Sequence, residues 1–313
     1  MTARSDRGQE AKGWVPRQGQ EAERRASRGL LLATLQGALL LASLLLASCA
    51  HAPPPSSEQP APDSITVALW RMDERGSTRV ADSGPFRLDG TAGRATLTQF
   101  GRVGQARSFR PQIDSFVYVP FNPVLDLTGA LSVEAWVYVR AFGVYEDTPL
   151  AGRWSEEANR QSWLLALGGQ RLEYPVVAEP GPGYHIAMFD RPLPGYVWFA
   201  YQPETAGPPR VFVTTRALEL ERWTHVAVTF DGEVVRFYID GELDSQYASG
   251  GRIRSSGAPL LIGNYFDPRL LTRFGGDLRP ESADGRAPYA FDGMIDELRI
   301  SNAARRDFPA RIR

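Results

Sequence analysis

The chain has 313 residues, of which 43% are hydrophobic and 23% charged, so it holds enough apolar side chains for a sizeable core. Its formal net charge is −1. Seven basic against four acidic residues put a net charge of +3 on residues 1–48, so the remainder of the chain carries −4. A mildly acidic domain has no electrostatic basis for binding nucleic acid and no polybasic patch for anionic lipid, so both partner classes are excluded.

The N-terminal segment has the pattern of a secretory signal peptide, in which basic residues precede an apolar stretch. Three arginines precede residues 29–47, and the stretch ends in Leu-Ala-Ser-Cys49, which contains the only cysteine of the chain. This ending resembles the lipobox of bacterial lipoproteins, and the resemblance implies removal of residues 1–48 and attachment of lipid to Cys49. A cleaved signal peptide without lipid and an uncleaved membrane anchor are the alternatives. Ala50 stands where inner-membrane lipoproteins tend to have aspartate, which favours the outer membrane of the cell envelope.

Residues 49–63 are interpreted as a proline-rich linker. Five prolines among residues 50–63 favour an extended, polyproline-like chain with a rise of about 3 Å per residue. Nothing in this composition could build a core. We therefore expect the linker to hold the following domain away from the membrane surface.

Residues 64–313 are uniform in character and are predicted to form one all-β domain. Residues 132–140 alternate between the two faces of a strand, as do residues 224–230 and 235–239. Asp231-Gly232 between the latter two runs predicts a β-hairpin, because both residues tolerate a positive φ. No window has a capped apolar period of 3.6 residues, so the predicted fold class is a two-sheet antiparallel sandwich.

Short motifs along this domain resemble, in order, those of the laminin-G-like jelly-roll domain of the concanavalin A-like lectin/glucanase superfamily. The segments are Ala68–Glu74, Asp82–Gly84, Gly101–Phe109, Phe116–Val119, Leu131–Val137, Trp223–Gly232, Arg236–Gly241, Leu261–Gly263 and Phe291–Ile300. The resemblance implies a jelly-roll sandwich with one concave face, in a family whose members bind glycans, proteins or other surface ligands, some of them with calcium. Residues 141–222 and 264–290 are longer than the family pattern, and such insertions often carry specificity.

A related branch of the superfamily comprises glucanases, whose laminarinase-type members have two glutamates flanking an aspartate on one strand. The nearest segment here, Glu242-Leu-Asp244, lacks the second glutamate, and Glu134 has no second carboxylate on its strand. The sequence also contains no Gly-x-Ser-x-Gly elbow and no His-x-x-x-His metal pair. We therefore expect a binding protein without catalysis, and a glycosidase is the least favoured alternative.

A structural calcium ion is expected next to the last strand. Asp296 lies in an apolar row with Met294 and Ile300, and a buried carboxylate needs a partner or a cation. First and last strands often neighbour each other in jelly rolls, which would bring Asp82 and Asp73 close to Asp296. Calcium takes six to eight oxygen ligands, which these carboxylates and backbone carbonyls could supply. The alternative is that Asp296 bonds to nearby backbone or to an arginine.

Two sets of residues are candidates for ligand binding. The first lies in the insertion, because aromatic residues in loops indicate binding more strongly than those in core strands; it comprises Trp154, Tyr184, His185, Trp198 and Tyr201. The second would lie on the concave face, but these residues also carry the family resemblance, which favours a structural role; it comprises Glu134, Trp136, Tyr138, His225, Arg236 and Tyr238. The predicted function is glycan binding by a lipid-anchored envelope protein, and binding or scaffolding of an envelope protein is the alternative.

Overall fold

The computed structural model describes residues 61–98, 100–112, 114–143, 148–155, 159–169, 194–264 and 290–309. The chain divides into two units, residues 1–58 and 59–313, and every described residue lies in the second. The described secondary structure is β-strand apart from one short 3-10 helix, η1 (Pro123–Leu125). Within the described ranges, no helix has the length and hydropathy of a membrane span.

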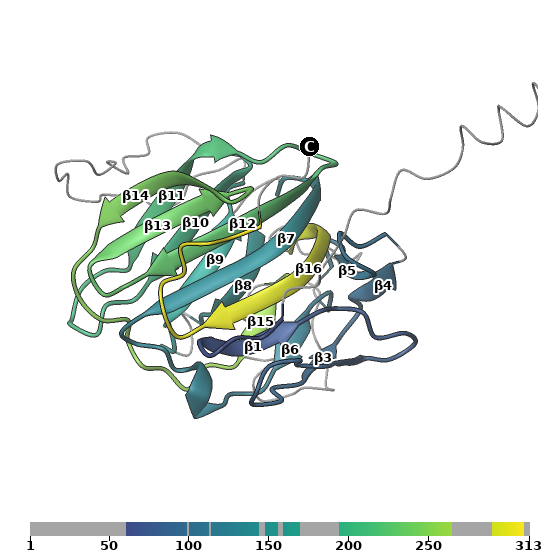
Figure 1. Cartoon of the computed structure of the whole chain (residues 1–313), viewed down its shortest axis with the longest axis horizontal. Helices are drawn as coiled ribbons and strands as arrows, with labels where there is room; N and C mark the ends of the chain where they lie inside the picture. The colour runs from purple at the N-terminus through teal and green to yellow at the C-terminus, as the bar shows by residue number, and fades with distance from the viewer. Residues whose placement is uncertain are drawn as a thin grey trace, which may run out of the picture. The chain divides into compact units, whose positions relative to one another are not determined.

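Two eight-stranded antiparallel sheets pack as a sandwich, which confirms the predicted fold class (Figure 1). Sheet A has the order β14-β13-β12-β7-β16-β5-β4, and β1 also pairs with β16. Its strands are β1 (Thr66–Trp70), β4 (Thr96–Thr98), β5 (Ala106–Phe109), β7 (Leu131–Ala141), β12 (Trp223–Phe230), β13 (Val234–Ile239), β14 (Glu242–Ala248) and β16 (Asp292–Ser301). Sheet B has the order β11-β10-β9-β8-β15-β6-β3-β2. Its strands are β2 (Arg79–Val80), β3 (Gly90–Ala92), β6 (Val117–Val119), β8 (Thr148–Arg153), β9 (Trp163–Leu167), β10 (Tyr196–Tyr201), β11 (Arg210–Ala217) and β15 (Leu260–Ile262).

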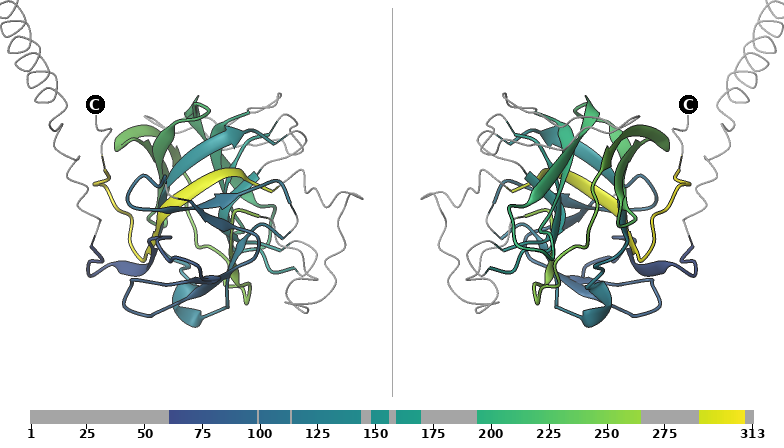
Figure 2. Two further views of the ribbon diagram at one scale, coloured as in Figure 1. Left: turned by 90° about the vertical axis from the view of Figure 1, so that its right-hand side faces the viewer. Right: turned by 90° about the vertical axis from the view of Figure 1, so that its left-hand side faces the viewer.

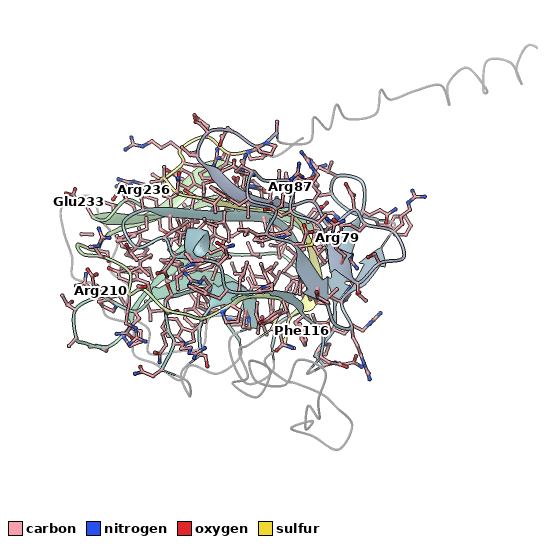
Figure 3. The ribbon with its side chains drawn as sticks, turned by 90° about the horizontal axis from the view of Figure 1, so that it is seen from below. Arg79, Arg87, Phe116, Arg210, Glu233 and Arg236 are labelled. Atoms are coloured by element: carbon pink, nitrogen blue, oxygen red, sulfur yellow. The ribbon has the colours of Figure 1, made fainter. Side chains whose placement is uncertain are left out.

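The main core lies between the two sheets because side chains alternate along the strands. In β7, Val133, Val137 and Val139 point into this core, whereas Glu134 and Trp136 point to the outer face of sheet A. The layers and the side chains that fill the space between them are seen from below in Figure 3. Each fully buried Val, Leu, Ile or Phe side chain contributes about 1.5–3 kcal/mol, so this interleaved layer is the main source of stability.

The predicted hairpin of β12 and β13 is confirmed, because Phe230 pairs with Val235 across the Asp231-Gly232 turn. The Asp231 carboxylate stabilises the turn by accepting hydrogen bonds from two of its backbone amides at 2.7 and 3.0 Å. The next turn joins β13 to β14 through Asp240 and Gly241, whose φ angles are 52° and 79°. Two successive positive φ angles fit the twist of a tight hairpin, and they explain an Asp-Gly pair at this position.

β16 lies at the centre of sheet A and pairs with three strands. It pairs with β7 along one side, and with β5 and β1 along the other. The first and last strands are therefore neighbours, as predicted. Glu297 has a φ of 50°, and the register with β7 shifts between Asp296 and Arg299 at this bulge. The bulge leaves Asp296 opposite Trp136 and Arg299 opposite Glu134 on the outer face of the sheet.

Side chains of β14 close the edge of the sandwich next to β11. The hydroxyls of Ser245 and Tyr247 both donate to the carbonyl of Val213 in β11. The Asp244 carboxylate accepts from the backbone N–H of Thr215 at 2.6 Å and from Arg216 at 2.9 Å. These bonds occupy backbone groups that an edge strand would otherwise offer to another chain.

Residues 302–309 leave β16 and cross the outer face of sheet A over β7 and β12 (Figures 1 and 2). Arg305 donates to both carboxylate oxygens of Asp63, at 2.6 and 2.7 Å. The ring of Phe308 lies 4.7 Å from that of Tyr238 and 5.9 Å from that of His225. This C-terminal segment therefore covers part of sheet A and ties the two ends of the domain together.

Candidate functional site

The outer face of sheet B carries a second, smaller apolar cluster. It comprises Trp154, Leu164, Ala166, Trp198, Ala200 and Val213, with Tyr196 and Val211 packed against it. In β9 and β10 the alternate residues point inward to the main core, so this set is the outward half of the same alternation. Two tryptophans predicted as ligand contacts are thus brought onto one face, although they lie far apart in the sequence.

Two small residues, Ala166 and Gly152, lie in the strands around this cluster. Ala166 pairs directly with Trp198, and Gly152 of β8 faces Leu164, where an added Cβ would come within 2.6 Å of Leu164 Cδ1. Trp154 is 4% exposed and Trp198 is 9% exposed. The Nε1 donor of Trp198 is buried and has no hydrogen-bond acceptor among the described residues. A buried N–H without an acceptor is costly, and a ligand oxygen that reached this donor would relieve that cost.

Tyr201 corrects one part of the sequence interpretation, because it lies between the sheets and not on the surface of the insertion. Its ring centroid is 5.1 Å from that of Phe230, and its hydroxyl is 2.6 Å from Oγ of Ser249. The reason is parity: Tyr201 is an odd number of positions from Trp198, so the two side chains leave β10 on opposite faces. Tyr184 and His185 lie outside the described residues, as does Cys49.

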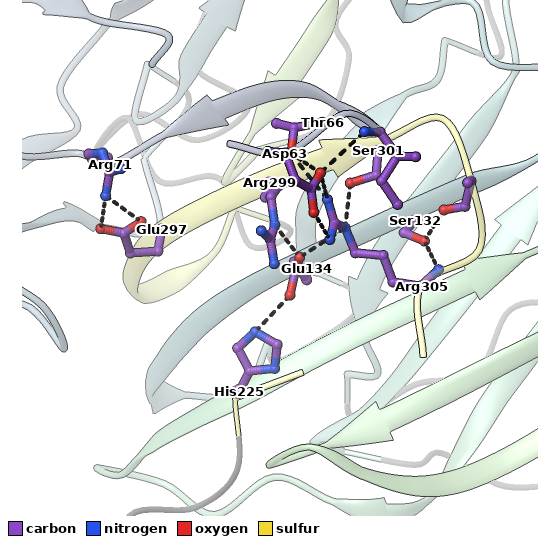
Figure 4. A network of polar contacts seen from close by, with 12 residues as sticks. Asp63, Thr66, Arg71, Ser132, Glu134, His225, Glu297, Arg299, Ser301 and Arg305 are labelled. Atoms are coloured by element: carbon purple, nitrogen blue, oxygen red, sulfur yellow. Dashed lines mark hydrogen bonds and ion pairs between the residues drawn. The ribbon is translucent and has the colours of Figure 1, made fainter. Parts of the chain in front are cut away.

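Glu134 is the centre of a buried charged network on the outer face of sheet A (Figure 4). Arg299 donates to its Oε1, and His225 Nε2 lies 3.3 Å from its Oε2. Arg305 of the C-terminal segment approaches Oε1 to 3.7 Å. Burial alone would raise the pKa of Glu134, but His225 and Arg299 outweigh it and lower the pKa below its ordinary value. The network holds the C-terminal segment on the sheet, which is a structural role.

Asp82, one of the predicted calcium ligands, is engaged by the backbone instead. Its Oδ1 accepts from the amides of Leu69 and Gly84 at 2.8 and 2.7 Å, and its Oδ2 accepts from Leu88 at 2.8 Å. These three bonds fix the loop after β2 onto β1. A carboxylate held in this way has little capacity left for a cation.

Asp296 and Asp73 lie close enough for their charges to interact. Asp296 is fully buried; its Oδ2 accepts from the amide of Val103 at 2.9 Å, and its Oδ1 has no partner among the described residues. Burial raises the pKa of Asp296 to about 8, and the charges of Glu297 and Asp73 add to this rise. Burial likewise raises the pKa of Glu297 to about 7, opposed by Arg71. No group of three His, Cys, Asp or Glu side chains suited to a metal occurs among the described residues, and the calcium site stays a prediction.

A sequence profile described as the concanavalin A-like lectin/glucanases superfamily matches residues 112–307. No curated protein matches the chain by sequence. Among solved structures, the binding domain of Paraclostridial Mosquitocidal Protein 1 is similar at 12% identity and a TM-score of 0.50, covering 77% of this chain and 49% of that one. The binding domain of botulinum neurotoxin serotype G is similar at 10% identity and a TM-score of 0.51, covering 77% and 48%.

A third similar structure concerns botulinum neurotoxin type C, whose cell entry is described as dependent upon interaction with two ganglioside molecules. Its sequence identity with this chain is 10% and its TM-score is 0.50. The match covers 77% of this chain and 48% of that one. The chain thus spans about half the length of these structures, and at such identities the likeness shows the fold alone. The sequence match covers more than half of the chain. The protein therefore belongs to the concanavalin A-like lectin/glucanases superfamily.

Proposed function

We propose that this protein is a lipid-anchored envelope protein that binds glycan, without catalysis, on the outer face of sheet B. The observation that carries the proposal is the pair of indoles, Trp154 and Trp198, on one face of the sheet. Aromatic rings offer an apolar face to the C–H groups of a sugar, and an indole N–H donates to a sugar hydroxyl. The Nε1 of Trp198, which has no partner among the described residues, supplies such a donor.

Both indoles are largely buried, so a glycan that contacts them has to displace neighbouring parts of the chain. We therefore expect binding to be accompanied by a local rearrangement at this face. The superfamily includes lectins, and botulinum neurotoxin type C, which has a similar fold, interacts with gangliosides. A shared fold does not fix the ligand, so these relatives support the ligand class and not its identity.

A glycan array tests this proposal with the fluorescently labelled full-length chain, kept in a detergent that contains no sugar. The Trp198→Phe variant keeps an aromatic ring and removes the indole N–H. Trp163→Phe is the matched control. Trp163 is on the neighbouring strand and its buried Nε1 also has no partner within the described ranges, but its side chain points into the main core. We expect glycan signal from the wild type and from Trp163→Phe, and a clear loss for Trp198→Phe. A blank array from a folded wild-type sample would favour an envelope protein as the ligand.

Lipidation at Cys49 is the second part of the proposal, and the lipobox-like sequence supports it. Such an anchor would place the domain in the cell envelope, with the outer membrane as the expected location. Intact-mass analysis of the mature protein tests it: we expect a chain that begins at Cys49 and carries the mass of acyl chains. A chain of unmodified mass in the soluble fraction would contradict anchoring. The Cys49→Ser variant is the matched control.

A structural calcium ion between Asp73 and Asp296 is the third part. The support is the Oδ1 of Asp296, which is buried without a partner among the described residues. Asp73 is held next to the same loop by the amide of Gln105 at 2.7 Å. Carboxylate oxygens and loop carbonyls are the ligands that calcium takes. When bound, the ion would neutralise the two carboxylates and fix the loop at residues 101–105 to β16.

A further inference from the structure

A pocket of about 730 Å³ opens at one end of the sandwich, where the β11–β12 connection meets the β13–β14 turn. It is lined by Arg216, Ala217, Leu218, Glu219, Arg222, Thr224, Ile239, Asp240, Gly241 and Glu242, which together are called the end pocket. Its volume lies within the roughly 300–1,000 Å³ that ligand sites occupy. None of these residues belongs to the apolar cluster around Trp154 and Trp198 on the outer face of sheet B, which is called the indole face.

Thr224 contributes a buried hydroxyl group to the lining of the end pocket. This residue is 3% exposed, and its Oγ1 has no hydrogen-bond partner among the described residues. A buried hydroxyl without a partner is costly, and it is rare in native proteins unless a water or a ligand meets it. Because Thr224 lines the pocket, its hydroxyl offers an unused hydrogen-bonding group in the pocket wall.

The charges of the end pocket favour a cation. Arg216 pairs with Asp244 at 2.9 Å and lies 3.8 Å from Glu242. Arg222 pairs with Asp240 and, at 3.0 Å, with Glu219. Asp244 does not line the pocket, so the two guanidinium groups of the lining face three carboxylates, which leaves a net charge of −1. Glu219 and Glu242 are the exposed members, so the surplus negative charge lies where a ligand would enter.

We propose that the end pocket binds the ammonium group of an amino sugar. A primary ammonium has three N–H donors and no acceptor, which suits the Thr224 oxygen together with the exposed carboxylates of Glu219 and Glu242. Leu218 and Ile239 supply apolar surface for the C–H groups of the sugar ring. Phosphate and uronate ligands are disfavoured, because the net field repels anions. The inference is independent of the glycan site on sheet B, since no residue is shared.

Calorimetric titration of the full-length chain tests this, in a detergent without sugar, with a trisaccharide of glucosamine as the probe. Cellotriose is the matched ligand, because it has a hydroxyl where glucosamine has its ammonium group. We expect the glucosamine trisaccharide to bind with a Kd about tenfold lower or better, the size of one hydrogen bond to a charged group. The preference for the glucosamine trisaccharide should shrink when salt is added.

Equal affinity for the two sugars, or no binding of either, would overturn the proposal. Tighter binding of trilysine than of the aminosugar would overturn the assignment to a sugar.

Variants locate the binding in the end pocket. Thr224→Val removes the unpartnered hydroxyl while keeping the shape of the side chain, and Thr229→Val is its matched control. Thr229 lies on the same strand and also has a buried hydroxyl without a partner among the described residues, but it does not line the pocket. We expect Thr224→Val to weaken binding of the glucosamine trisaccharide by about fivefold or more, and Thr229→Val to leave it unchanged. A Glu219→Gln/Glu242→Gln double variant should abolish the preference over cellotriose. The same loss in both threonine variants would refute the site.

The Trp198→Phe variant separates this proposal from the proposed function. It should leave the affinity for the glucosamine trisaccharide unchanged, because Trp198 does not line the end pocket. Loss of this affinity in Trp198→Phe, with no effect of Thr224→Val, would assign the amino sugar to sheet B and overturn the end-pocket proposal. The glycan array tests the site on sheet B independently of the end pocket.

Discussion

Arg153 offers a direct test of how the indole face is supported, since it immediately precedes Trp154. Its side chain is 0% exposed, and its guanidinium donates to the carbonyls of Leu125 (2.7 Å), Ala258 (3.1 Å) and Ser256, and to the Asp126 carboxylate at 2.9 Å. Arg153→Met keeps most of the apolar stem and removes all of these donors. Removing one member of a buried ion pair leaves its partners uncompensated and lowers the free energy of unfolding by about 3–5 kcal/mol. For a domain of this size that corresponds to a fall in Tm of about 6–20 °C.

Thermal unfolding followed by circular dichroism measures this fall, with Arg79→Met as the control. Arg79 is an exposed arginine paired with Asp89 at 2.6 Å, and such a surface ion pair contributes about 1 kcal/mol or less. We expect Arg153→Met to be far less stable than Arg79→Met and to bind glycan more weakly, because Trp154 loses its fixed neighbour. A decrease in Tm below about 4 °C for Arg153→Met would refute the reasoning, since it would mean that these buried acceptors find other partners at little cost.

Three further predictions concern single groups. Thr224→Val should raise the free energy of unfolding by about 1 kcal/mol, because it removes a buried hydroxyl that has no partner in the part of the chain that the structure describes. Chemical denaturation measures this change, and a destabilised variant would contradict the reasoning. Arg305 lowers the pKa of Asp63 below its ordinary 3.8, so the pair stabilises the fold above that pH. Asp63→Asn should therefore lower Tm slightly at pH 7, and the difference should shrink as the pH falls below 3.8; a constant difference would count against the ion pair. In chelator, Asp296→Asn should raise Tm because it removes a buried carboxylate. Added calcium should raise the Tm of the wild type but not that of Asp296→Asn. A wild type whose Tm does not respond to calcium would contradict the proposed calcium site.

Much of the fold could be predicted because it depends on local patterns. Alternation in residues 132–140 placed the inward valines of β7, and the Asp231-Gly232 turn placed the β12–β13 hairpin. The pairing of β1 with β16 followed from the jelly-roll order of strands. In each case a short stretch of sequence contains the physical cause: the period of a strand, or a turn that needs a positive φ.

The candidate sites were less predictable because they depend on contacts between distant segments. The exclusion of Tyr201 from the surface could have been found, since Val197, Phe199 and Tyr201 form the apolar alternation of one strand. The three amide bonds to Asp82 had no local signal, because they come from β1 and from two positions in the following loop. The end pocket could not be predicted for the same reason, because its residues come from two connections that meet only in the folded chain.

The most direct test of glycan binding compares the wild type, Trp198→Phe and Trp163→Phe on the same glycan array. The two tryptophans lie on neighbouring strands and face opposite sides of sheet B, and each has a buried indole N–H without a partner among the described residues. Glycan binding by the wild type that survives in Trp163→Phe and is lost in Trp198→Phe is the predicted result. Binding that is equal in all three proteins would contradict the assignment of the outer face of sheet B as the glycan site.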